Sequence, residues 1–161
     1  MADHLLAAVE APGEDGIFVY MGGDQVVPFD VRRARIHKDV KIIPLVAFHN
    51  RRHLISVEFH DGVEIIERYA FSGCRLRSVK LLGIRIMKEG VFCACKDLTD
   101  VEFGDQLEKI ENSLFCGCTS LRNITMPNVK TIGVWAFSHC EQLTDLELPE
   151  GLETLQGGAP S

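Results

Sequence analysis

Two Cys-x-Cys pairs are the residues of this chain best suited to metal or redox chemistry. Cys93 and Cys95 form the first pair, and Cys116 and Cys118 form the second, 23 residues later. Four converging thiolates can hold a zinc ion in a tetrahedral site, and two thiols on neighbouring segments can form a disulfide. The sequence therefore raises a metal- or redox-responsive protein as one hypothesis.

The spacing of the cysteines favours a structural role for most of them. Four of the six follow a phenylalanine by three positions and lie 21, 23 and 22 residues apart: Cys74, Cys95, Cys118 and Cys140. A small apolar residue that recurs at one repeat position is expected in the core. Cys93 and Cys116 lie two residues earlier and are expected to face outward, so the two sets would not converge. We expect no metal site and no cofactor.

Histidine offers a weaker candidate site. His37 and His60 share one repeat position, and two stacked imidazoles can bind a metal or titrate near neutral pH. Leu82 and Gly104 occupy the following equivalent positions and supply no third ligand, so a solvated pair is expected. The sequence contains no phosphate-binding glycine loop, nucleophile elbow or HExxH metal motif. We therefore expect no catalytic residues and no enzyme.

The elements that position these side chains are five complete repeats of 21 to 23 residues, between residues 40 and 151. The second repeat is one residue short between its cysteine and its leucine. Each repeat carries a phenylalanine at the same place: Phe48, Phe71, Phe92, Phe115 and Phe137. Val101 and Phe103 share one face of a predicted strand, and the residues between them share the other. The sequence predicts a repeat solenoid of about five coils, with short parallel strands, 3₁₀ or helical turns and a buried phenylalanine ladder.

Residues 132–149 read IGVWAFSHCEQLTDLELP, which is close to the pattern I-x-x-x-A-F-x-x-C-x-x-L-x-x-I-x-L-P. This pattern resembles the BspA-like class of leucine-rich repeats, and the resemblance covers residues 40–151. Arg51 replaces the cysteine in the first repeat, and Val91 and Leu114 replace the alanine in two others. The resemblance implies a binding or scaffold module without catalysis. It also raises a cell-surface adhesin as an alternative, since members of this class occur at cell surfaces.

The segments outside the complete repeats need separate interpretations. Residues 1–16 are interpreted as a mobile N-terminal tail. Residues 17–39 are predicted to form a cap, in which a hairpin with Gly22 and Gly23 at its turn precedes a half repeat. Residues 152–161 are interpreted as an incomplete sixth repeat.

The incomplete sixth repeat predicts a poorly covered C-terminal end. It lacks the phenylalanine, the cysteine and the strand of the other repeats. We therefore expect Ile132, Phe137 and Leu146 to be thinly covered and the last strand, residues 143–148, to have an unpaired edge. Such an end would favour self-association of the chain.

Composition excludes several classes of protein. The chain has 161 residues, of which 46% are hydrophobic and 25% charged, so it can bury a core and is not wholly disordered. No apolar run approaches the roughly 18 residues of a membrane span, and the net charge of −6 disfavours a nucleic-acid binder. The first residues lack the basic and apolar segments of a signal peptide, so a cytoplasmic or other intracellular location is expected.

Charged side chains alternate with inward-facing ones in the predicted strands. These charged positions are the candidate partner-binding face: Arg33, Arg35, Glu58, Lys80, Asp100, Glu102, Asp145 and Glu147. At the position between the two inward strand residues the signs alternate at first, in Arg35, Glu58, Lys80 and Glu102, so neighbouring strands are expected to pair charges. Residues 31–53 hold seven Lys or Arg against one Asp, whereas residues 97–161 hold three against eleven Asp or Glu. This dipole would steer a protein partner toward the strands, and the sequence predicts a protein-interaction or scaffold module.

Overall fold

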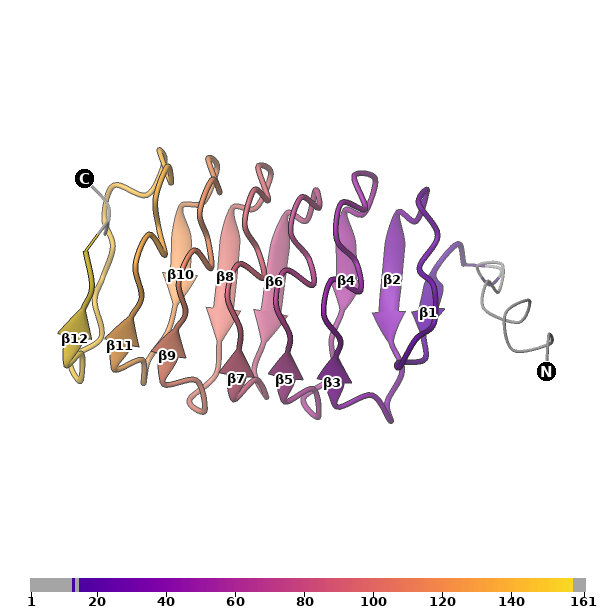
Figure 1. Cartoon of the computed structure of the whole chain (residues 1–161), viewed down its shortest axis with the longest axis horizontal. Coiled ribbons are helices and arrows are strands. Elements are labelled where there is room, and N and C mark those ends of the chain that lie inside the picture. Colours follow the sequence, from indigo (N-terminus) through magenta and orange to yellow (C-terminus); the bar gives the residue numbers. More distant parts are fainter. Residues whose placement is uncertain (1–12, 14, 158–161) are drawn as a thin grey trace.

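The structure is a computed structural model that describes residue 13 and residues 15–157. These residues wind into a stack of coils between the two ends of the molecule (Figure 1). Below, coils 1 to 5 are the ones that carry Phe48, Phe71, Phe92, Phe115 and Phe137. The tail predicted for residues 1–16 lies almost entirely outside the described residues. Within the described part, no helix is long and apolar enough to cross a membrane.

Two walls of short strands form two sides of the solenoid (Figure 1). The first wall contains β1 (Phe18–Tyr20), β2 (Arg33–Ile36), β4 (Ser56–Glu58), β6 (Ser78–Leu81), β8 (Asp100–Phe103) and β10 (Asn123–Thr125). The second wall contains β3 (Ile42–Ile43), β5 (Ile65–Ile66), β7 (Ile86–Met87), β9 (Lys109–Ile110), β11 (Thr131–Ile132) and β12 (Thr154–Leu155). Every pairing between these strands is parallel. The predicted solenoid of parallel strands is confirmed.

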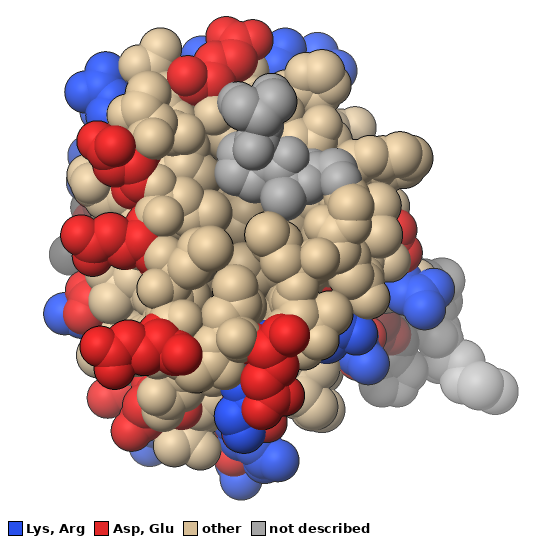
Figure 2. Space-filling view, turned by 90° about the vertical axis from the view of Figure 1, so that its left-hand side faces the viewer, with Lys and Arg blue, Asp and Glu red and all other residues tan. Residues whose placement is uncertain are grey.

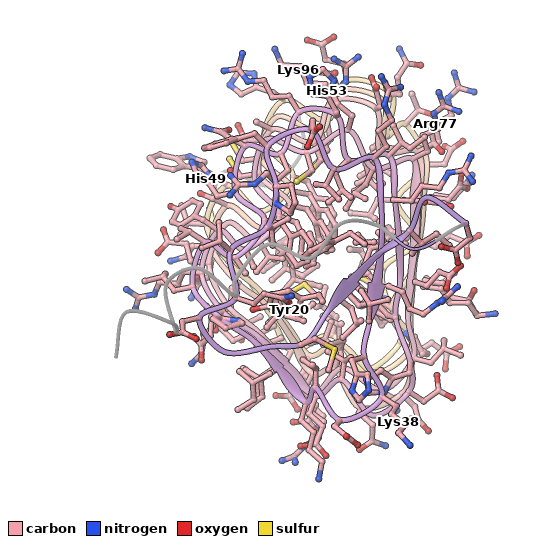
Figure 3. All side chains as sticks on the ribbon, turned by 90° about the vertical axis from the view of Figure 1, so that its right-hand side faces the viewer. Tyr20, Lys38, His49, His53, Arg77 and Lys96 are labelled. Carbon is pink, nitrogen blue, oxygen red and sulfur yellow. The ribbon has the colours of Figure 1, made fainter. Side chains whose placement is uncertain are left out.

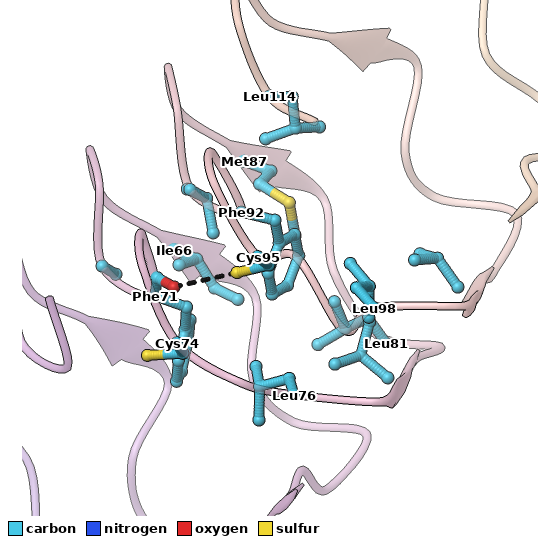
Figure 4. Packing of buried hydrophobic residues seen from close by; sticks show 14 of the residues in the cluster. Ile66, Phe71, Cys74, Leu76, Leu81, Met87, Phe92, Cys95, Leu98 and Leu114 are labelled. Carbon is cyan, nitrogen blue, oxygen red and sulfur yellow. Dashed lines mark hydrogen bonds between the residues drawn. The ribbon is translucent and has the colours of Figure 1, made fainter. Parts of the chain in front are cut away.

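The third side of the solenoid is a column of turns that carries the phenylalanines. Neighbouring rings from Phe48 to Phe137 stack with centroid separations of 4.8, 5.9, 5.8 and 5.5 Å, and each ring is at most 1% exposed. Figure 4 shows part of this ladder with the aliphatic side chains that pack against it. The predicted buried ladder is therefore confirmed.

The inward cysteines add hydrogen bonds to the phenylalanine ladder. Each thiol donates to the backbone carbonyl of the phenylalanine in the coil before, at 3.0 to 3.1 Å. The pairs are Cys74 to Phe48, Cys95 to Phe71, Cys118 to Phe92 and Cys140 to Phe115; the Cys95 bond is dashed in Figure 4. All four thiols are buried, so they act as core residues with one polar contact each.

The turns themselves differ from the predicted 3₁₀ or helical turns. Successive backbone amides point in alternate directions. The amide of Ala47 donates to the carbonyl of Pro44 in its own turn, whereas the amide of Phe48 donates to the carbonyl of Ala70 in the next coil. Two residues per turn also have left-handed backbones, such as Val46 with φ 53° and Asn50 with φ 56°. A left-handed residue interrupts any helix, so the prediction of helical turns is wrong.

The N-terminal cap is an additional coil, and the predicted hairpin is wrong. β1 pairs in parallel with β2, with Phe18 opposite Ala34 and Tyr20 opposite Ile36. Phe18 and Tyr20 thereby continue the inward positions of the first wall, and the Tyr20 ring packs edge-on against Phe48 at 5.1 Å. The tyrosine covers the end of the phenylalanine ladder, a role that an antiparallel hairpin would leave unfilled.

The C-terminal end is better covered than the sequence predicts. β12 pairs with β11, and Ile132 and Phe137 are 0% and 1% exposed. The prediction that these two residues are thinly covered is therefore wrong, because the segment after Gly151 supplies a further strand of the second wall. The expected strand at residues 143–148 is also absent among the described residues, and Leu148 is exposed there. Self-association through this end stays a prediction.

Candidate functional site

The candidate partner-binding face lies mainly on the strands of the first wall. Arg33 and Arg35 project from β2, Glu58 from β4, Lys80 from β6, and Asp100 and Glu102 from β8; all six are exposed. Asp145 and Glu147 are exposed too, but they lie on a segment without strand pairing. The fold therefore brings six of the eight predicted residues onto one wall.

Opposite charges on neighbouring strands form two separate ion pairs. Arg35 Nε lies 2.6 Å from Glu58 Oε2, and Lys80 Nζ lies 3.8 Å from Glu102 Oε2. The predicted pairing across strands is thus confirmed at two places. Among the described residues, no ion pair within 4.0 Å joins Glu58 to Lys80, although these residues come next to one another in the alternating series.

This gap between Glu58 and Lys80 coincides with a break in the first wall. β1, β2 and β4 form one three-stranded sheet, and β6, β8 and β10 form another, with no pairing between β4 and β6. The break falls at coil 2, whose turn is one residue short between Cys74 and Leu76. This shortening lies just before β6, and we expect it to keep β6 from pairing with β4. The facing edges of β4 and β6 thereby lack the ladder hydrogen bonds of a continuous sheet.

A groove crosses the first wall at this break. Its volume is about 580 Å³, and it extends over β4, β6, β8 and β10. The residues that line it include Val57, Val79 and Val101, whose side chains are buried, and the outward-facing residues beside each of them. The outward side chains beside β4 and β6 are short at Ser56 and Ser78 and long at Glu58 and Lys80. A partner can approach the strand backbone over the serines and meet one charge of each sign.

Asp100 accepts two hydrogen bonds where the groove passes over β8 and β10. Its carboxylate accepts from the Thr99 hydroxyl at 2.7 Å and from Asn123 Nδ2 at 2.8 Å. These two hydrogen bonds, Thr99 first, hold the pKa of Asp100 below its ordinary value. Asp100 therefore stays ionised and fixed beside β10.

A row of cations lies along the edge between the turn column and the first wall. Figure 3 shows the cations Arg77 and Lys96, with the imidazole of His53 beside them, projecting from this edge. Further exposed cations occupy the turns that lead into the strands of the first wall: Arg32, Arg52 and Arg122. Among the described residues, none of these six makes an ion pair within 4.0 Å. The excess of Lys and Arg in residues 31–53 indicates part of this row. Arg77, Lys96 and Arg122 can be found from the sequence only by aligning the turns of successive repeats.

Acidic side chains gather at the C-terminal end of the solenoid. Figure 2 views the C-terminal end, where Asp and Glu side chains follow one border and uncharged residues fill the centre. The surplus of Asp and Glu counted in residues 97–161 therefore has a counterpart on this end of the molecule.

The second wall has a break of its own, between coils 3 and 4. β3, β5 and β7 form one sheet, β9, β11 and β12 form another, and β7 and β9 are not paired. A groove of about 440 Å³ lies at this step, lined by residues such as Met87 and Lys109. Both walls are thus interrupted once, at different steps of the stack.

The histidines and cysteines considered for metal or redox chemistry lie in different parts of the coils. His60 Nε2 lies 3.0 Å from the carbonyl oxygen of His37, so this ring nitrogen is engaged by the backbone. No group of three or more His, Cys, Asp or Glu side chains within the described residues is arranged to hold a metal ion. Cys93 and Cys116 are partly exposed, in contrast to the four buried thiols.

The architecture defines a leucine-rich repeat type of solenoid, and comparison with known proteins identifies its family. The BspA type leucine-rich repeat region matches residues 41–159 in six copies, so the chain belongs to the BspA-type leucine-rich repeat family. The match extends to residue 159, into the segment that the sequence predicts to be an incomplete repeat. No functionally curated protein matches the sequence.

Solved structures with the same fold are bacterial proteins. A leucine-rich cell surface protein from Faecalibacterium prausnitzii is 22% identical with a TM-score of 0.72, over 90% of this chain and 44% of its own. A leucine-rich repeat protein from Bacteroides ovatus is 21% identical with a TM-score of 0.64, over 88% and 47%. The pneumococcal vaccine antigen PcpA is 24% identical with a TM-score of 0.62, over 76% and 32%. The chain spans less than half the length of each, and at these identities the likeness shows the fold alone.

Proposed function

We propose that this chain is a non-catalytic protein-interaction module that binds its partner on the first wall, across the break between β4 and β6. The observation that carries the proposal is the groove at this break, because it joins open strand edges to charged side chains of both signs. Strand edges without partners are sites where another polypeptide can add hydrogen bonds.

The chemistry of the groove specifies a polar partner segment. Ser56, Ser78 and Asn123 offer hydrogen-bonding groups. Glu58 and Lys80 are charged side chains that pair with strands away from the break and not with each other. A stable interface usually buries about 800 Å² on each partner, which is more than one groove provides. The partner must therefore extend along the wall, over the neighbouring strands β8 and β10.

The row of cations described above supports approach by an acidic partner. It borders the first wall and carries six side chains without ion pairs in the described residues. Such a field raises the association rate of an oppositely charged partner and weakens as ionic strength rises. Binding in the groove should therefore be fastest at low salt.

The location of the protein stays open to experiment. An intracellular location remains the prediction from the sequence, while the structures from F. prausnitzii and pneumococcus are described as a cell surface protein and a vaccine antigen. The cell-surface adhesin alternative uses the same wall, so the binding experiment applies to both.

A matched pair of charge reversals tests the proposal. Lys80→Glu changes the first wall and Lys109→Glu the second; both lysines are exposed and each loses one weak ion pair, to Glu102 and Glu111 respectively. Immobilised wild-type protein is exposed to an extract of the source cells, and retained proteins are identified by mass spectrometry. We expect one or more proteins that Lys109→Glu retains and Lys80→Glu loses by at least about tenfold. Equal retention by both variants, or loss with Lys109→Glu alone, would contradict binding on the first wall.

A further inference from the structure

We propose that Cys93 and Cys116 form a reversible disulfide that fastens coil 3 to coil 4. This site is separate from the first wall and does not depend on the proposed function. The disulfide forms by exchange with a low-molecular-weight disulfide of the oxidised glutathione class and opens again in excess thiol.

The backbone already holds the two cysteines opposite one another. The amide of Phe92 donates to Leu114 at 3.1 Å, and the amide of Ala94 donates to Cys116 at 2.7 Å. Residues opposed across such a ladder lie about 4.8 Å apart, within the range of roughly 4.4 to 6.8 Å that a disulfide requires between Cα atoms. Closing the bond therefore needs side-chain rotation and no shift of the coils.

Only these two thiols are available for exchange among the six. Cys93 and Cys116 are partly exposed, whereas the four ladder thiols are buried. Burial raises the pKa of Cys74 to about 12 and that of Cys140 to about 12, and it raises the pKa of Cys95 and Cys118 still more strongly. Because the thiolate is the reacting form, the ladder thiols stay inert at neutral pH.

The order of attack follows from the surroundings of Cys93. Burial first, and the neighbouring Cys116 thiol second, raise the pKa of Cys93 to about 11. Cys93 is therefore protonated at neutral pH, so its sulfur reacts in the second step, once its proton has been removed.

The exchange proceeds in two balanced steps. The Cys116 thiolate attacks one sulfur of the small disulfide, forms a mixed disulfide and expels one small thiolate. Cys93 then gives up its proton, its sulfur attacks the Cys116 sulfur, and the second small thiolate leaves. The cysteine pair loses two electrons, and the small disulfide gains them and ends as two thiols.

The position of this pair in the stack gives the disulfide a structural effect. Coils 3 and 4 are the step at which β7 and β9 are not paired, so the second wall contributes no ladder hydrogen bonds there. A covalent bond on the turn side of that same step would restrain its opening. At the equivalent turn position the other coils carry His49, Ser72 and Ser138, so no other step can be fastened in this way.

Oxidation of the folded full-length protein tests the inference. The protein is incubated with oxidised glutathione, unreacted thiols are alkylated, and peptides are mapped by mass spectrometry. We expect one Cys93–Cys116 crosslink with the other four thiols alkylated, and a melting temperature raised by about 5 to 10 °C. The Cys93→Ser variant should stop at a mixed disulfide on Cys116 and show no such rise. A crosslink between any other pair, or no crosslink in protein shown to be folded, would overturn the proposal.

Discussion

The turn column and the strand walls follow the same repeat, but only the walls are interrupted. Between coil 1 and coil 5, three backbone hydrogen bonds of the turn column join every pair of neighbouring coils. The walls break between β4 and β6 and between β7 and β9. The comparison shows that the turns keep the coils in register, while changes in repeat length appear as openings between strands. The grooves of about 580 and 440 Å³ lie at those openings.

The difference has a physical cause in how each side is built. A turn residue is fixed by a stacked ring, by a thiol hydrogen bond and by left-handed residues at constant places. A second-wall strand has two residues and few ladder hydrogen bonds, so losing its pairing with one neighbour costs little. The shorter segment between Cys74 and Leu76 leaves the stacking of the phenylalanine rings in place.

Removing one ring of the ladder should have the largest effect. Phe115 is 0% exposed and lies between Phe92 and Phe137, so Phe115→Ala leaves a cavity in the middle of the stack. We expect a loss of about 3 to 5 kcal/mol in the free energy of unfolding, measured by chemical denaturation. Trp135→Ala is the control, because this side chain is 59% exposed in the same column. A loss below about 1 kcal/mol for Phe115→Ala would show that the ladder does not hold the stack.

A substitution at Gly90, the first of the two left-handed residues of coil 3, should have the next largest effect. Gly90 has φ 66°, and an added Cβ would overlap the ring of Tyr69 in the coil before. We expect Gly90→Ala to lower the free energy of unfolding by about 1 to 3 kcal/mol. Gly151→Ala provides the comparison, since its added Cβ meets no atom within 4 Å. Equal effects at the two glycines would show that the left-handed backbone and the contact with Tyr69 do not constrain this turn.

Restoring the missing residue of coil 2 should repair the first wall. An Asp inserted between Arg75 and Leu76 gives this turn the length of the turn that contains Lys96 and Asp97. We expect β4 to pair with β6, slower amide exchange in residues 78–81 and a gain of about 1 kcal/mol in stability. The same insertion between Glu150 and Gly151 should give no such gain. Unchanged exchange in residues 78–81 would show that repeat length does not cause the break.

The smallest expected effect concerns the pH dependence of the first wall. The pKa of Asp100 is lowered in the folded protein by hydrogen bonds from Thr99 and Asn123, below an unfolded value of about 3.9. These bonds therefore contribute stability above about pH 4, and that contribution is lost as pH falls through the folded pKa. Because Asp100 is exposed, we expect Asn123→Ala to cost only a few tenths of a kcal/mol, about the same from pH 5 to pH 7 and less at pH 2. A cost that grows toward pH 2 would contradict this sign.

Much of the fold could be predicted from the sequence, because side chains at fixed spacing specify it. The phenylalanine and cysteine positions indicate the ladder, and the alternation at Asp100, Val101, Glu102 and Phe103 indicates the strand and its exposed charges. The family match over residues 41–159 agrees with this repeat assignment.

The departures from prediction share one physical reason. Gly22 and Gly23 permit a hairpin turn, yet Phe18 and Tyr20 bury more side-chain surface as a parallel first strand over the ladder. The missing residue between Cys74 and Leu76 is visible in the sequence, but that it coincides with an unpaired step between β4 and β6 follows only from the fit of neighbouring coils. Local patterns therefore specify which residues are buried, while the long-range fit of the coils decides which strands pair and where the grooves lie.

Hydrogen exchange of the complex with the retained partner tests binding on the first wall most directly. Amide exchange is compared in free and bound protein, peptide by peptide. Binding across the β4/β6 break predicts slower exchange in residues 56–58, 78–81 and 100–103, with little change in residues 65–66, 86–87 and 109–110. Protection of the second-wall segments with no change in the first wall would contradict the proposed function.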